Sequence, residues 1–264
     1  MIHKIVCYLK FLWKGKTKYS IQSPFVHDFI ERVLDDKELY YSFLAMNYLK
    51  SELEKNKSLL SIHDKGAGSH FSNKKTKSVE QIAKTAISSE FKARSLFKLI
   101  NLYQPKIILE LGTSLGLTTC YLANAKRNSE VITVEGSIDI HEVAKKNFKK
   151  MGLHKIRALC GGFDEQLPII LQNITELDFV FFDGNHTKEA TLNYYNQCKA
   201  KANPNTVFVF DDIYWSKPMT SAWNKIISDS SIRLSLDLFS FGVVFFLENR
   251  AKQHFQIIHS VNLN

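Results

Sequence analysis

The stretch KIILELGTSLG (106–116) decides the fold. An apolar run of strand type, 106–111, leads into a turn that contains Gly112 and Gly116, and the helix-length segment 117–126 follows. The two glycines let the backbone turn sharply and approach a ligand, whose polar groups then meet amides at the start of the next helix. The turn lacks the third glycine of a dinucleotide fingerprint and the Gly-Lys-Ser/Thr of a P-loop. The glycines alone are a weak signal, because any strand-to-helix turn can use them.

Further apolar runs of strand type alternate with segments of helical length and periodicity. They are VITVE (131–135), KIRALC (155–160), LDFVFF (177–182) and TVFVFD (206–211). Apolar strands that alternate with helices predict a parallel sheet covered on both faces. RLSLDLF (233–239) and GVVFFLE (242–248) flank a tight Ser240-Phe241 link, which predicts an antiparallel hairpin. The predicted fold class is therefore α/β: a Rossmann-like, doubly wound, mostly parallel sheet with a C-terminal antiparallel hairpin.

Residues 1–77 are predicted to form a helical N-terminal extension to a catalytic domain at 78–264. Residues 1–15 have the spacing of a short basic amphipathic helix, and the pattern of 22–57 is also helical. The polar stretch 63–78 contains Gly-Ala-Gly-Ser (66–69) and is interpreted as a boundary or a mobile lid. One long helix is expected over about 79–103, ending before Pro105.

The composition of the 264 residues is that of a globular protein, with 45% hydrophobic and 23% charged residues. Extensive disorder and low-complexity architecture are excluded on this ground. The apolar runs are too short to span a membrane. The four cysteines lie far apart, so neither a zinc site nor a redox pair is indicated, and reduced thiols in a cytoplasmic compartment are expected.

The positive charge is concentrated at the N-terminus. Lysine and arginine exceed aspartate and glutamate by nine, and residues 1–18 hold five lysines and no acid. This segment fits a signal peptide badly, because Lys10 interrupts its apolar stretch and no small-residue cleavage site follows. Two interpretations of this segment remain. It is either an ordinary packed helix, or it makes a weak contact with the inner face of an anionic membrane. Nucleic acid is not favoured as a partner.

Polar residues follow the ends of the predicted strands, where open α/β sheets bind ligands. Glu135 ends the second strand, 23 residues after Gly112, and an acid there can accept hydrogen bonds from both hydroxyls of a ribose. A solvated carboxylate is an equally economical interpretation. The loop with Gly161, Gly162 and Asp164 could lie along an adenine ring, or Asp164 could cap a helix.

Three carboxylates follow the fourth and fifth strands. Asp183 comes after the fourth strand, and Asp211 and Asp212 after the fifth. Carboxylates at the ends of neighbouring strands repel unless something positive lies between them, and an oxygen-rich cluster suits Mg²⁺, Mn²⁺ or Ca²⁺. The alternative is that Asp183 or Asp212 caps a helix and binds no ion.

These motifs, taken in order, resemble a known family. ELGTSLG, VEGS, DFVFFDGNH and FDDIYWS are similar to the signature of class I S-adenosylmethionine-dependent methyltransferases over about residues 78–250. The similarity is greatest to the cation-dependent, catechol-type O-methyltransferases and their Asp-Gly-Asp-His relatives. The resemblance implies that S-adenosylmethionine is bound by Glu110, Gly112, Thr113, Ser114, Gly116, Glu135, Gly136, Ser137, Gly162, Phe163 and Asp183.

The resemblance also implies the catalytic residues. Asp183, Asp211 and Asp212 would bind Mg²⁺, and His186 would act as the base together with Asp183. Two positions depart from the family pattern: Asp212 stands where asparagine is usual and His186 where lysine is usual. Histidine suits a base near neutral pH, and the alternative is that His186 only positions Asp183.

The expected reaction is methyl transfer from S-adenosylmethionine to a hydroxyl of a small molecule, assisted by a divalent cation. Tyr214 and Trp215 are interpreted as walls of the acceptor pocket, although core packing would also explain them. Gly68 and Ser69 would contact the substrate from the lid. The alternatives are a metal-independent or RNA-directed methyltransferase and a membrane-associated cofactor-binding protein.

Overall fold

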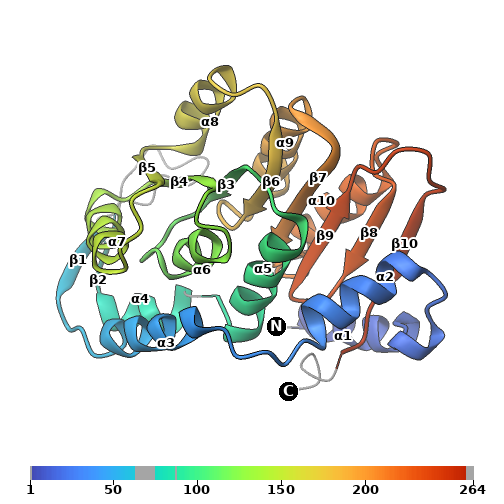
Figure 1. Cartoon of the computed structure of the whole chain (residues 1–264), viewed down its shortest axis with the longest axis horizontal. Coiled ribbons are helices and arrows are strands. Elements are labelled where there is room, and N and C mark those ends of the chain that lie inside the picture. Colours follow the sequence, from blue (N-terminus) through green and yellow to red (C-terminus); the bar gives the residue numbers. More distant parts are fainter. Residues whose placement is uncertain (1, 63–74, 87, 260–264) are drawn as a thin grey trace. The chain divides into compact units, whose positions relative to one another are not determined.

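The computed structural model of the protein describes residues 2–62, 75–86 and 88–259 (Figure 1). The chain forms two compact units. Residues 37–174 make up the first, called here the central unit, and residues 1–36 with 175–264 make up the second, called the terminal unit. Neither border coincides with the predicted division at 77/78, which therefore stays a prediction. Gly68 and Ser69, with the rest of the predicted lid at 66–69, lie outside the described residues.

The central unit contains a parallel ladder of three strands. Its strands, in the order in which they pair, are β3 (Ile107–Leu111), β4 (Glu130–Glu135) and β5 (Ile156–Cys160). The apolar runs read from the sequence form these strands because their side chains are buried under helices. The helices of this unit are α3 (Tyr41–Leu53), α4 (Val79–Ala86), α5 (Glu90–Tyr103), α6 (Leu117–Ala125), α7 (Ile138–Lys150) and α8 (Phe163–Gln172).

The single helix expected over 79–103 is wrong, because α4 and α5 are separate helices. Ser89 has an extended backbone, and its hydroxyl accepts the N–H of Lys92 as the N-cap of α5. A serine that satisfies the free amides of a new helix also stops the preceding one from continuing through it. The predicted end before Pro105 is confirmed: α5 ends at Tyr103, and Gln104 adopts a left-handed conformation.

A strand pair that was not predicted lies between the helical pattern of 22–57 and helix α4. β1 (Leu59–Ile62) pairs in antiparallel fashion with β2 (Lys75–Ser78). The start of α7 holds β1 through two hydrogen bonds: the N–H of Ser61 donates to Asp139 at 2.7 Å, and the hydroxyl of Ser137 donates to the Ser61 carbonyl at 3.2 Å. The sequences of these strands, LLSI and KTKS, do not alternate apolar and polar residues, so the pattern that marks a half-buried strand is missing.

The terminal unit contains the remaining strands of the chain's described part. They pair in the order β10 (Gln253–Gln256), β8 (Leu234–Asp237), β9 (Phe241–Phe245), β7 (Ala202–Asp211) and β6 (Leu177–Phe182). β6 runs parallel to β7, and the predicted hairpin of β8 and β9 is confirmed as antiparallel. β10 was not predicted, because its sequence, QHFQ, carries one apolar residue and forms an edge strand.

Helices α9 (Lys188–Lys199) and α10 (Lys217–Ser228) cover one face of this ladder (Figure 1). The ring of Tyr195 lies 6.3 Å from Phe208, and that of Trp223 lies 6.1 Å from Phe210. Gly242 provides room for the indole, because a Cβ at this position would come within 2.4 Å of the Trp223 ring. Aromatic packing therefore fixes both helices on the strands.

The N-terminal helices cover the opposite face of the same ladder. Phe25 lies 5.2 Å from Phe245 and belongs to α2 (Pro24–Phe29), which begins at Pro24 as predicted. The neighbouring elements are α1 (Ile2–Lys14), the short 3₁₀ turn η1 (Lys18–Ser20) and the π-helical turn η2 (Ile30–Leu34). The fold class is thus confirmed as α/β, with mostly parallel strands, C-terminal antiparallel strands and N-terminal helices. None of the described helices is long and apolar enough to cross a membrane.

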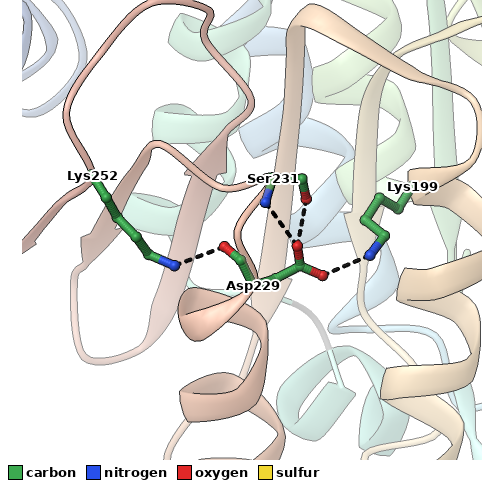
Figure 2. Close-up of polar contacts among 4 residues, drawn as sticks. All are labelled: Lys199, Asp229, Ser231 and Lys252. Carbon is green, nitrogen blue, oxygen red and sulfur yellow. Dashed lines mark hydrogen bonds and ion pairs between the residues drawn. The ribbon is translucent and has the colours of Figure 1, made fainter.

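A polar cluster closes the end of α10 (Figure 2). The carboxylate of Asp229, the residue after this helix, accepts hydrogen bonds from the N–H and hydroxyl of Ser231 at 2.9 and 2.7 Å and from Lys199 at 2.6 Å. Lys252 donates to the Asp229 carbonyl at 2.7 Å. Burial raises the pKa of Asp229, but the bonds from Lys199 and Ser231 outweigh it and hold that pKa well below its usual value.

We predict that Asp229→Asn lowers the free energy of unfolding by about 1 kcal/mol at pH 7, because it removes the charged partner of Lys199. A folded-state pKa below the unfolded one stabilises the fold above about pH 4, and this contribution disappears as the pH falls. Urea unfolding at pH 7 and at pH 3 should therefore show a difference between variant and wild type that shrinks in acid. A difference that is constant with pH would contradict this account.

Candidate cofactor-binding loop and acidic strand ends

The loop after β3 has the sharp turn that its glycines predict. Gly112, Ser114 and Gly116 all have positive φ angles, of 114°, 48° and 80°. Gly116 is the N-cap of α6, and a Cβ there would lie 2.5 Å from the ring of Phe148. A residue with a side chain would be strained at this position and would also collide with α7. The amides of Gly112 and Thr113 both donate to the Val134 carbonyl, at 3.1 and 3.2 Å, so β4 holds the loop in place.

Glu135 joins this loop to the next one. One carboxylate oxygen accepts the N–H of Ser114 and the other accepts the N–H of Ser137, each at 2.9 Å. Burial raises the pKa of Glu135, and the hydrogen bonds from the backbone of Ser137, Ser114 and Gly136 oppose that effect. A carboxylate offers about four acceptor positions, so these amides leave room for a further donor such as a ribose hydroxyl. Glu135 is therefore fixed by the protein rather than freely solvated, and its binding role stays a prediction.

Glu110 is fully buried in β3. Its Oε2 accepts hydrogen bonds from the hydroxyls of Thr119 at 2.5 Å and Thr133 at 2.7 Å, whereas its Oε1 has no hydrogen-bond partner among the described residues. Burial, which the nearby Glu135 reinforces, raises the pKa of Glu110 to about 7. A buried oxygen without a partner is costly, and a ligand that donates a hydrogen bond would relieve the cost. This orphaned atom fits a cofactor that carries an ammonium group and a positive sulfonium.

Sequence reasoning missed two residues of this site, Thr119 and Thr133. The hydroxyl of Thr133 lies 2.5 Å from that of Thr113, so the three threonines and Glu110 form one buried polar group. The signal was present in EVITVE (130–135), where Thr133 is a polar residue inside an apolar strand. A buried hydroxyl in such a position needs a partner, and here the partner is a carboxylate of the adjacent strand.

The turn after β5 also contacts Glu135, because the N–H of Gly161 donates to the Glu135 carbonyl at 2.9 Å. Helix α8 begins at Phe163 with Gly162 as its N-cap, so the alternative that Asp164 caps the helix is wrong. Asp164 lies in the first turn, where its negative charge complements the helix dipole. The turns after all three strands of the central unit therefore converge on Glu135, and the adenine contact of Gly162 and Phe163 stays a prediction.

His186 and Asp183 lie between β6 and α9. Asp183 directly follows β6, and the N-cap of α9 is Thr187, whose hydroxyl accepts the N–H of Ala190. The alternative that Asp183 caps this helix is therefore wrong. Asn185 has a positive φ of 49°, and its side chain donates to the hydroxyl of Tyr194 at 3.2 Å. These contacts fix the backbone on which the partly exposed His186 stands.

The acid pair after β7 has a distinct geometry. Asp211 is buried, and its Oδ1 accepts the N–H of Asp212 at 2.7 Å. Asp212 has a left-handed backbone, with φ of 49°, and its N–H also points to the Ser240 carbonyl at 3.0 Å. Asp212 does not cap α10, because the N-cap of that helix is Ser216. Asparagine and aspartate tolerate this backbone conformation better than most residues. The conformation is thus compatible both with Asp212 and with the asparagine that is usual in the family pattern.

The predicted metal cluster is not formed in this arrangement. β6 and β7 are parallel neighbours, as expected, so Asp183, Asp211 and Asp212 follow the same edge. However, over residues 2–62, 75–86 and 88–259 no group of three or more histidine, cysteine, aspartate or glutamate side chains is placed to hold a metal ion. The cation site therefore stays a prediction, and no catalytic step below depends on it.

Tyr214 and Trp215 have different environments. Tyr214 is buried; its hydroxyl donates to Asp237 at 2.5 Å and its ring stacks on Phe239 at 5.2 Å. Burial, together with the nearby Asp237, raises the pKa of Tyr214 above its usual value. Trp215 is 60% exposed. Core packing thus accounts for Tyr214, and Trp215 is the better placed of the two to meet an acceptor.

Comparison with known proteins finds similarity to methyltransferases. A family model described as a methyltransferase domain matches residues 109–213, from β3 to just beyond the acid pair. The catechol O-methyltransferase of Niastella koreensis is 30% identical over 142 residues, which are 52% of this chain and 63% of that protein. The O-methyltransferase imqG of Aspergillus flavus is 26% identical over 114 residues, or 41% and 45% of the two chains. The chain thus spans less than two thirds of the length of these curated relatives.

Solved structures show the same fold. The S-adenosylhomocysteine-bound methyltransferase PaMTH1 of Podospora anserina superposes with a TM-score of 0.56 at 16% identity, over 81% of this chain and 100% of that one. An O-methyltransferase of Bacillus cereus in complex with S-adenosylhomocysteine superposes with a TM-score of 0.55 at 18% identity, over 83% and 96%. Residues 109–213 thus match a methyltransferase-domain model, and over part of its length the chain is similar to proteins named O-methyltransferases.

The raised pKa of Glu110 predicts a pH-dependent cost to stability. A buried acid whose folded-state pKa lies above its unfolded value of about 4.3 destabilises the fold as the pH rises through that interval. Without ligand, the stability of Glu110→Gln relative to wild type should rise by about 3 kcal/mol between pH 5 and pH 8. Urea unfolding at both pH values measures this change. Glu130→Gln, at the exposed start of β4, is the matched control, and parallel pH profiles for Glu110→Gln and wild type would refute the prediction.

Proposed function

We propose that the protein transfers a methyl group from S-adenosylmethionine to a hydroxyl of a small molecule. One observation carries the proposal: Glu135, anchored by two amides, and the orphaned oxygen of Glu110 lie at the ends of adjacent strands of a methyltransferase domain. The relation to proteins named O-methyltransferases supports a hydroxyl as the acceptor. The catalytic domain is proposed to comprise residues 78–264.

The central unit would bind the cofactor, whose sulfonium makes the methyl carbon electrophilic. The glycines of the loop allow the close approach of the methionine part, and the Glu110 Oε1 accepts a hydrogen bond from it. Glu135 holds the ribose hydroxyls with the acceptor positions that the protein leaves open. Residues that complete the site are Thr113, Ser114, Gly136, Ser137, Gly162, Phe163 and Asp183.

His186 is proposed as the general base. A ring nitrogen of the imidazole would take the proton from the acceptor hydroxyl as the oxygen attacks, and Asp183 would favour the resulting imidazolium. His186 is suited to this role because it is partly exposed and stands on a backbone fixed by Asn185 and Thr187. Trp215 is proposed to contact the acceptor. RNA is not favoured as the acceptor, because DGNH (183–186) replaces the Asn/Asp-Pro-Pro-Tyr/Phe motif of many base methyltransferases.

A divalent cation is a separate proposal. Its support is the resemblance to the cation-dependent enzymes and the oxygen chemistry of Asp183, Asp211 and Asp212. These three carboxylates, at the carboxyl ends of β6 and β7, would bind Mg²⁺ once their side chains turned toward a common point. The ion would supply a positive charge next to the acceptor oxygen and lower the pKa of its hydroxyl.

The cofactor proposal predicts a difference between the two ends of β4. Glu135→Ala should abolish the binding of S-adenosylhomocysteine, a loss of at least about 100-fold, because two charge-assisted hydrogen bonds disappear. Glu130→Ala, at the exposed opposite end of the strand, should bind like wild type. Isothermal titration calorimetry of both variants measures the affinities, and thermal unfolding verifies that each variant is folded. No binding by the wild-type chain, or equal binding by the two variants, would overturn the cofactor site.

The cation proposal predicts that Mg²⁺ binds to the protein saturated with S-adenosylhomocysteine. Asp212→Ala should weaken that binding by at least about tenfold, because one of three carboxylate ligands is lost. Glu130→Ala removes an exposed acid at the opposite end of β4 and is the matched control. Calorimetric titration of Mg²⁺ into each protein measures the effect. Absence of a Mg²⁺ signal in the wild type would remove the cation and leave the methyltransferase proposal unchanged.

A further inference from the structure

Helix α1 has two apolar faces, of which only one is packed. Cys7 and Phe11, one turn apart, are buried against the terminal unit. A second set of apolar residues, at the spacing i, i+3, i+4, i+7 and i+11 of one helix face, is exposed to solvent. This outer stripe comprises Ile2 (80% exposed), Ile5 (54%), Val6 (43%), Leu9 (61%) and Trp13 (83%). The amphipathic pattern in the sequence therefore marks the face that the fold leaves uncovered, rather than the face that it buries.

The inner face is held firmly by the terminal unit. The rings of Tyr8 and Phe11 lie 4.8 and 5.4 Å from that of Phe239. The Nε2 of His3 lies 3.0 Å from the hydroxyl of Thr220 on α10. A long-range hydrogen bond at His3 and aromatic packing at Tyr8 and Phe11 therefore hold the helix on the terminal unit. The outer stripe thus belongs to a docked helix, and its exposure is a feature of the folded unit.

Positive charge accompanies the outer stripe. Residues 1–18 contain five lysines and no acid. Lys18 pairs with Asp35, whereas Lys4, Lys10, Lys14 and Lys16 are exposed. A short helix with leucine, isoleucine and tryptophan on one side and lysines beside them has the properties of a segment that lies in the plane of a membrane interface. A second copy of this face would bring lysines against lysines, which disfavours self-association.

We propose that α1 docks the protein on an anionic lipid surface. The outer stripe enters the headgroup region, with Trp13 at the boundary of the acyl chains, and Lys10 and Lys14 extend their ammonium groups to the lipid phosphates. The inner side of the helix also contacts the segment after β7, because the Lys4 Nζ lies 5.8 Å from the centroid of the Trp215 ring. Since Phe239 contacts both Tyr8 of the helix and Tyr214, the same aromatic group supports the docking helix and the segment that follows the acid pair.

The test is co-sedimentation of the full chain with phosphatidylcholine vesicles, with and without phosphatidylglycerol. Wild type should bind the anionic vesicles and not the neutral ones. Leu9→Asp and the double reversal Lys10→Glu/Lys14→Glu should each weaken binding by at least about tenfold. Leu44→Asp changes an exposed leucine of α3 in the same way, and Lys146→Glu/Lys149→Glu reverses two exposed lysines of α7; both controls should bind like wild type.

Two further measurements keep the outcome clear. All variants should retain the wild-type melting temperature, because the altered side chains are exposed, and light scattering reports whether Leu9→Asp changes the oligomeric state. Absence of vesicle binding by the wild type, equal binding to neutral vesicles, or equal losses in the control variants would overturn the proposal. A dimer that Leu9→Asp dissociates, without vesicle binding, would show that a second copy covers the stripe and would also overturn it.

Discussion

The central unit depends on one constraint: a carboxylate at the end of β4 must satisfy backbone amides of two different turns. Glu135 accepts from Ser114 and from Ser137, and its own carbonyl accepts from Gly161. Three strand ends are thereby held in one polar network, to which the turns contribute backbone amides and Glu135 its carboxylate and carbonyl. A turn built in this way keeps its amides ordered before any ligand arrives, which lowers the entropy cost of binding.

Glu110 and Asp237 illustrate opposite uses of a buried acid. Asp237 is fully buried, with bonds from Tyr214 and Gln256 and from the Phe239 amide, so it serves the packing of the terminal unit. Glu110 leaves one oxygen without a partner. Burial raises the pKa of both groups. Satisfied buried acids contribute to structure, whereas an unsatisfied one next to a ligand loop is a stronger indication of a binding role.

Much of the fold could be predicted because its strands are continuous apolar runs, and runs such as 177–182 become the buried strands of a covered sheet. Four features could not. The break at Ser89 depends on a cap within a helical pattern, and β10 and the pair β1–β2 depend on partners distant in sequence. The amphipathic helix at 1–15 was predicted, but the exposure of its outer stripe was not, because periodicity shows that one face is apolar but not whether that face is covered. At the site, the glycines and Glu135 could be placed from their spacing. Thr133 could only be recognised as a polar residue inside an apolar strand, and Thr119 not at all, because both bond to Glu110 from other elements, Thr119 from α6 and Thr133 from β4.

The contact between Gly242 and Trp223 limits which residues these two positions can accept. The indole lies so close to the glycine Cα that any added carbon on β9 would overlap it. A substitution at either position alone is therefore costly. A larger residue at 242 requires a smaller one at 223, and a smaller ring at 223 leaves a void that a side chain at 242 could fill. Among related sequences we expect these two positions to covary: both are kept, or both are substituted together.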